Sequence, residues 1–202
     1  GDFVIRSNCD EISFKDLSNR FSAGTKLVPP AFNPKVKNAS LLIKRQNGEM
    51  VFQVGGTYGK DSFVFEGKKA SGSKLGFAAG ISMTDPKLSN LPGLGALAPL
   101  EKVVKMQNLT LVAANYASRD FRFPNLAAFD NPALSSHQMP MPATAGGLQE
   151  GLNFYGKWRL DSSKKETKIL KKFLGLDPEL DITLQVSPKP ADSSRVFLTY
   201  VT

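Results

Sequence analysis

The sequence predicts an α+β, β-rich fold: an antiparallel or mixed sheet of about seven to nine strands with two short helices packed on one face. Three observations predict it. Short apolar segments alternate at the two-residue period of strands, an Asn-Gly pair joins two of them, and a Ser-x-x-Glu capping box precedes a helical pattern. A β-sandwich, or an elongated sheet from a repeat array, is the alternative.

The first 38 residues are expected to form an irregular or helical segment, because their apolar residues lack a clear period and Pro29-Pro30 interrupts them. Residues 39–120 are predicted to be a β-meander followed by a helix and a strand. It begins with a hairpin of residues 40–45 and 50–54, in which Asn47-Gly48 supplies the positive-φ positions of a type I′ turn.

Further strands are predicted at residues 62–66 and 75–81 of this meander. A helix at residues 96–106 follows, because its apolar side chains recur at helical spacing, and a strand at residues 109–116 follows the helix. Residues 121–151 are rich in Pro, Met and Gly and show no period, so they are predicted to be a long loop, either a linker or a docking loop.

Residues 152–202 are predicted to be a strand-helix-strand-strand unit in the same domain. Alternation defines a strand at residues 152–160, and Ser163 with Glu166 forms the capping box of a helix at residues 164–174. Strands at residues 180–186 and 195–201 complete the unit. A strand-helix-strand order at both 75–112 and 152–186 fits either a duplication or ordinary α+β architecture.

The core is predicted to draw on the large apolar residues of these elements. They are Leu42, Val51, Phe52, Val64, Phe77, Leu111, Phe154, Trp158, Phe173, Ile182, Leu184 and Phe197.

The composition limits which classes of partner and which cellular locations the sequence favours. The net charge is +8, but each half of the chain holds 13 basic and 9 acidic residues, so no basic stripe or tail makes nucleic acid a favoured partner. No apolar run is long enough for a transmembrane segment. A single cysteine cannot form an internal disulfide, while Asn38 and Asn108 begin glycosylation sequons. A secreted, surface or cytoplasmic location therefore stays open.

The residues of common catalytic and cofactor sites are scarce. One histidine and one cysteine, His137 and Cys9, cannot assemble an ordinary zinc site, and no Gly-x-Ser-x-Gly elbow presents a nucleophile. The glycine pattern at residues 93–98 follows a poor strand, which argues against a dinucleotide site. We therefore predict no catalytic residue, no metal site and no cofactor. The acidic group Asp177, Glu179 and Asp181 leaves a carboxylate-based hydrolase as an alternative.

Two sets of residues are candidates for binding. The first holds the aromatic and loop residues that could meet a ligand or partner: Phe121, Phe123, His137, Met139, Met141, Tyr155 and Tyr200. The second is the basic side of the helix at 164–174, which could contact an anionic surface: Lys164, Lys165, Lys168, Lys171 and Lys172.

The sequence thus favours a non-catalytic binding or structural module. The strand predicted at the end of the chain suggests excision from a larger protein, whose remaining chain or another protein would be the partner. A lipid or apolar-ligand carrier is the second hypothesis, because the strands are rich in Phe and the helix at 164–174 is basic and amphipathic.

Overall fold

The architecture is given by a computed structural model. It describes residues 2–21, 35–46, 48–69, 75–87, 101–102, 104–135, 147–161, 163–174, 179–186 and 195–201.

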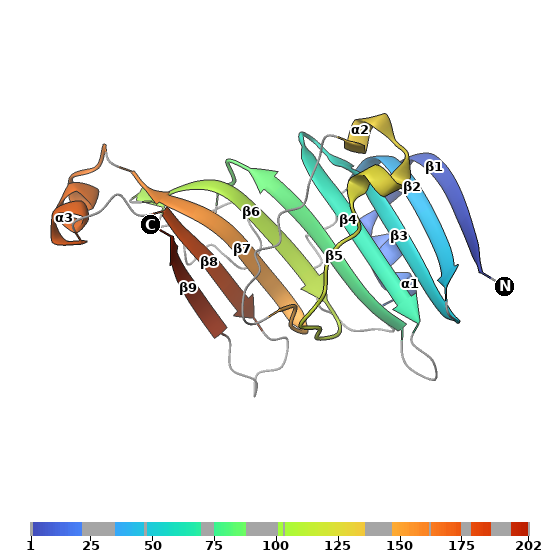
Figure 1. Cartoon of the computed structure of the whole chain (residues 1–202). Helices are drawn as coiled ribbons and strands as arrows, with labels where there is room; N and C mark the ends of the chain where they lie inside the picture. The colour runs from blue at the N-terminus through green and yellow to red at the C-terminus, as the bar shows by residue number, and fades with distance from the viewer. Residues whose placement is uncertain are drawn as a thin grey trace.

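Within these residues, nine strands form one open antiparallel sheet, in which each strand pairs with its neighbour in the chain. Figure 1 shows this meander running from the N-terminal strand to the C-terminal one. The β-rich fold and the expected number of strands are confirmed. The strands are β1 (Phe3–Ser13), β2 (Lys35–Gln46), β3 (Glu49–Tyr58), β4 (Asp61–Lys69), β5 (Leu75–Thr84), β6 (Val104–Ala114), β7 (Gly151–Leu160), β8 (Glu179–Val186) and β9 (Arg195–Val201).

The hairpin of β2 and β3 forms where the Asn-Gly pair predicts it. Gln46 lies opposite Glu49, so the connection is two residues long, and Gly48 has a φ of 81°. A glycine adopts this left-handed conformation without the steric cost that a side chain brings. The short connection fixes the register of β3 against β2.

The N-terminal segment differs from the expectation. Residues 3–13 are a strand, β1, and helix α1 (Phe14–Phe21) follows directly. Ser13 ends the strand and caps the helix, because its Oγ accepts a hydrogen bond from the Asp16 N–H at 3.3 Å. The irregular interpretation was wrong for residues 3–13 because an edge strand exposes both faces and therefore needs no alternation.

Helix α1 covers one side of the sheet, which we call the α1 face. Phe14 and Leu17 are buried there in a cluster with side chains of β3, β4 and β5. The rings of Phe14 and Phe63 meet edge to face at 6.0 Å, and those of Phe65 and Phe77 stack at 5.8 Å. Aromatic packing of this kind stabilises a core beyond the area it buries.

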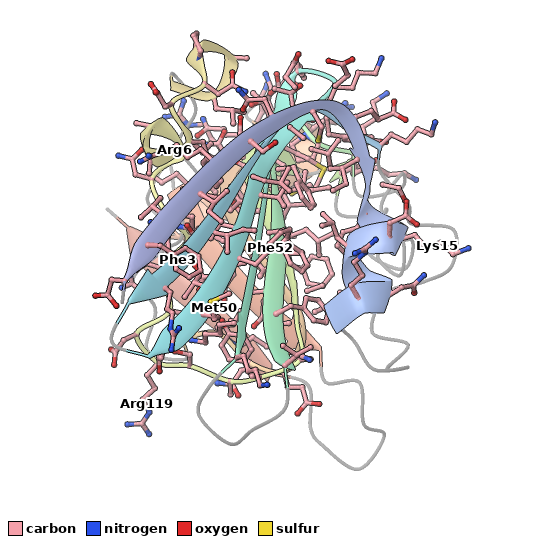
Figure 2. The ribbon with its side chains drawn as sticks, turned by 90° about the vertical axis from the view of Figure 1, so that its right-hand side faces the viewer. Phe3, Arg6, Lys15, Met50, Phe52 and Arg119 are labelled. Carbon is pink, nitrogen blue, oxygen red and sulfur yellow. The ribbon has the colours of Figure 1, made fainter. Side chains whose placement is uncertain are left out.

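The opposite side, the α2 face, is covered by the 3₁₀ helix η3 (Leu126–Phe129) and the short helix α2 (Pro132–Ser135). Their side chains pack against Leu42 and Val64. A Cβ at Gly55 would lie 2.9 Å from the ring of Phe129, so the close approach requires glycine. Figure 2 shows α1 and the η3–α2 segment on opposite sides of the sheet. The expectation of helices on one face is therefore wrong.

One of the two predicted helices is present in the structure, and the other is wrong in the part that the structure describes. Helix α3 (Lys165–Leu174) is confirmed, and it lies beyond the ends of β7 and β8 rather than over a face (Figure 1). Most of the helix predicted at 96–106 lies outside the described residues. Its last three residues belong to β6, so the helical interpretation is wrong there.

Half of the predicted core is buried. Leu42, Val64, Phe77, Leu111, Phe154 and Trp158 are buried, whereas Val51 and Phe52 are half-buried. The side chains at 173, 182, 184 and 197 lie outside the described ones. Most of the buried side chains that the structure describes lie in the middle of the sheet, where strands have neighbours on both sides.

The predicted long loop is partly folded onto the sheet. Residues 121–135 supply Phe121, Leu126, Phe129 and Leu134 to the buried clusters of the α2 face. Leu148 joins them, and its backbone pairs with Ser118. Residues 136–146 lie outside the described residues.

Candidate functional site

The predicted aromatic contact residues lie mostly inside the protein. Phe121 and Tyr155 are buried in one cluster of the α2 face, and half-buried Phe123 packs edge to face on Phe121 at 4.8 Å. Tyr155 is predicted to lie on the polar side of its strand, but the segment around Leu148 covers that side. Burial gives Phe121 and Tyr155 a role in packing and argues against partner contact.

A buried polar network surrounds Tyr155. The Tyr155 hydroxyl donates to the Gly147 carbonyl at 3.3 Å, and Gln185 Nε2 donates to the same oxygen at 2.8 Å. Asn153 bonds both backbone groups of Gln149, accepting from its N–H at 3.0 Å and donating to its carbonyl at 2.8 Å. Burial raises the pKa of Tyr155 to about 12. The network fastens residues 147–149 to the sheet, which is a structural role.

The other predicted contact residues are less completely described. His137, Met139 and Met141 lie outside the described residues. Tyr200 lies in β9, and its side chain lies outside the described ones. Their role stays a prediction.

The basic side of α3 faces solvent. The described lysine side chains there are exposed, and so is Ile169, at 69%, whereas Thr167 is buried. The predicted apolar side of this helix therefore does not pack as a whole on the protein. The exposed lysines are Lys164, Lys165, Lys168 and Lys172, while the side chain of Lys171 lies outside the described ones.

Within the described part of the chain, no three His, Cys, Asp or Glu residues come together as a metal site. Cys9 is half-buried, and burial raises the pKa of its thiol, which disfavours the reactive thiolate. The pKa of Asp161 is lowered by two hydrogen bonds from Ser163. Asp177 lies outside the described residues, as do the side chains of Glu179 and Asp181, so the hydrolase alternative gains no support.

Strand β1 is the most exposed strand among those whose side chains the structure describes. It pairs only with β2 among the described residues, and every side chain from Phe3 to Asn8 is exposed. Its odd-numbered residues from 3 to 9 lie on the α1 face, since Cys9 packs against that core, and Arg6 lies opposite Leu42 on the α2 face. An edge strand of 11 residues leaves a row of backbone donors and acceptors available to another strand.

Side-chain bonds hold β1 in place while leaving two of its charges available. Asn8 Oδ1 accepts a hydrogen bond from Ser40 Oγ at 2.7 Å, and Glu11 forms an ion pair with Lys35 at 2.9 Å. Arg6 and Asp10 are exposed and form no ion pair with any described residue. The strand thus keeps its register while its charges can meet a partner.

A second exposed surface lies at the end of the sheet where β1, β3 and β5 begin and where β2 and β4 end. Phe3 lies opposite Arg45, Arg45 opposite Met50, Met50 opposite Lys69, and Lys69 opposite Leu75. We call these five residues the terminal row. Phe3, Met50 and Leu75 are exposed by 39%, 41% and 40%, and Arg45 and Lys69 are also exposed. Apolar and basic side chains therefore alternate across five strands.

Sequence reasoning missed both surfaces. The only local signal for β1 is the run Phe3-Val4-Ile5, which has strand propensity but no alternation. The terminal row has no local signal, because its members are up to 72 positions apart and only the register of the sheet joins them.

Comparisons with known proteins add no assignment: no family model, no curated protein and no solved structure matches this chain. Among the described residues, no helix is long and apolar enough to cross a membrane.

Proposed function

We propose that the chain is a non-catalytic binding module that joins a partner by adding a strand at β1, and that a second copy of the chain can supply this strand. The observation that carries the proposal is the exposed edge of β1. Strand addition gains affinity from main-chain hydrogen bonds, and the side chains of the edge select the partner.

The charges of β1 support a second copy as the partner. Two β1 strands, one from each copy, can pair antiparallel about a two-fold axis at Asn8. The numbers of any two residues that then face each other add up to 16. Arg6 then faces Asp10 of the other copy, and this pair occurs twice. Opposite charges across strands stabilise a pair, and like charges destabilise it.

A charge-swap series tests this register. Arg6→Asp places an aspartate opposite Asp10 at two points of the dimer, and Asp10→Arg does the same with arginines. Each cross-strand charge pair is worth about 0.2–1 kcal/mol and the dimer holds two such pairs, so we expect either variant to weaken self-association by about twofold to thirtyfold. The double variant Arg6→Asp, Asp10→Arg restores the pairs and should recover the wild-type constant, measured by sedimentation equilibrium.

The control is Lys60→Asp, which makes the same change of charge in the exposed β3–β4 turn. It should leave self-association close to wild type. The proposal is contradicted by a chain that stays monomeric at high concentration, or by a double variant as weak as the single ones.

A further inference from the structure

A different surface, built from side chains of the α1 face rather than from the edge of β1, points to a second kind of partner. We propose that the terminal row docks the protein on an anionic lipid surface. This inference is independent of strand addition, because it requires no backbone group of β1.

The row is continuous with the core. The next row on the same face holds Ile5, Ile43, Phe52, Gly67 and Phe77, which lie opposite one another in order. Its exposure falls from 53% at Ile5, through half-buried Ile43 and Phe52, to buried Phe77. Figure 2 shows Phe3, Met50 and Phe52 on β1 and β3, toward the lower ends of the strands. Apolar surface therefore extends without interruption from the core to the end of the sheet.

The row has the dimensions of a docking surface. Five neighbouring strands place its outermost members about 19 Å apart, because adjacent strands are about 4.8 Å apart. Exposed apolar side chains that gather on one surface beside polar groups are typical of binding sites.

The charge beside the row selects the partner. The strand ends carry Lys44, Arg45, Lys68 and Lys69, while the described acidic residues nearby are Asp2 and Glu49. Lys68 reaches the other face, where its Nζ lies 4.8 Å from the centre of the Tyr116 ring. Arg45 and Lys69 therefore stand between the exposed apolar side chains of the row. Anionic membrane surfaces bind this combination, because apolar groups enter the interface while basic groups contact the phosphates.

Vesicle flotation of the full chain tests the inference, with phosphatidylcholine vesicles compared with vesicles that also contain phosphatidylserine. The wild type should bind the second kind, and added salt should weaken binding. Because a basic residue near an anionic surface contributes about 1 kcal/mol, Arg45→Gln with Lys69→Gln should weaken binding about thirtyfold. The matched control, Lys37→Gln with Lys60→Gln, removes the same charge from the opposite ends of these strands and should bind within about threefold of wild type.

The apolar members need their own test. Met50→Gln with Leu75→Gln keeps every charge and should weaken vesicle binding at least tenfold, while circular dichroism shows an unchanged fold. Soluble polyglutamate serves as an anion without an apolar layer, and this variant should bind it as the wild type does. Three results would overturn the inference: no preference for phosphatidylserine, equal losses in the control, or no loss of vesicle binding in the Met50 and Leu75 variant.

Discussion

At the scale of single residues, burial gives several polar and aromatic side chains structural roles. Tyr155, Asn153 and Gln185 are buried polar residues of β7 and β8 that hold the backbone of residues 147–149 against the sheet. Gly147 belongs to the same contact, since its φ is 56° and a Cβ there would lie 2.6 Å from the Cα of Arg119. Such positions are costly to change, because a buried polar group left without its hydrogen-bond partner has lost its hydration and gains nothing in return, which costs about 1–3 kcal/mol.

Tyr155 should make the free energy of unfolding decrease at alkaline pH. Burial raises its pKa from about 10 in the unfolded chain to about 12, so the fold favours the neutral phenol. The resulting contribution to the free energy of unfolding is complete below pH 10 and is lost as the pH rises to 12. It amounts to roughly 3 kcal/mol, because each unit of pKa difference is worth about 1.4 kcal/mol. Tyr155→Phe should cost about 1 kcal/mol at neutral pH and flatten this decline.

Urea unfolding at pH 8 and pH 11 measures both effects. The control is Tyr58→Phe, which changes an exposed tyrosine. Its free energy of unfolding should decline with pH as steeply as that of the wild type. An equally steep decline in Tyr155→Phe would show that Tyr155 is not the group responsible.

At the scale of elements, helix α1 depends on packing more than on its own length. It spans eight residues, fewer than an isolated helix needs in water, and its buried residues Phe14 and Leu17 attach it to the α1 face. Ser13 contributes the cap that begins the helix. The helix therefore forms because the sheet offers an apolar surface for it.

Leu17→Ala should destabilise the protein by about 2–5 kcal/mol, because it removes buried methyl groups and leaves a cavity between α1 and the sheet. Thermal and urea unfolding measure the change. Asn19→Ala, on the exposed side of the same helix, should cost less than about 0.5 kcal/mol. Equal losses in the two variants would contradict the packing of α1 on the sheet.

At the scale of the whole molecule, the sheet is protected unevenly. The central strands β3 to β5 are covered by α1 on one face, and Leu126, Phe129 and Leu134 cover the other face between β2 and β4. Among the described strands, β1 pairs only with β2, and it exposes most of its side chains. Local stability follows such differences in burial.

Hydrogen exchange at low protein concentration should show the slowest amides in β3 to β5 and faster exchange in β1. Protection of β1 should rise with concentration in the wild type, because strand addition covers its edge, and should not rise in Arg6→Asp. A β1 as protected as β4 in dilute solution would contradict the exposed edge.

Local pattern made several elements predictable. The hairpin follows from Asn47-Gly48, which fixes a two-residue turn. The pattern Ser163-x-x-Glu166 predicts the position of α3, which begins at Lys165, although the Ser163 hydroxyl donates a hydrogen bond to Asp161 at 2.6 Å. Strands β4, β5, β7 and β8 show enough alternation or β-branched content to be recognised. In each case the residues that determine the element are neighbours in the chain, so no distant contact is needed.

The sequence by itself determined the β-rich class, the central hairpins and most strand positions, because these depend on short-range periodicity. Only the tertiary structure decided that residues 3–13 form an edge strand, that helices lie on both faces, and that Phe121 and Tyr155 are buried. It alone brought Phe3, Met50 and Leu75 into one exposed row. The physical reason is that burial and cross-strand neighbours depend on register and on which segments fold back over the sheet. Contacts between residues far apart in the chain determine both.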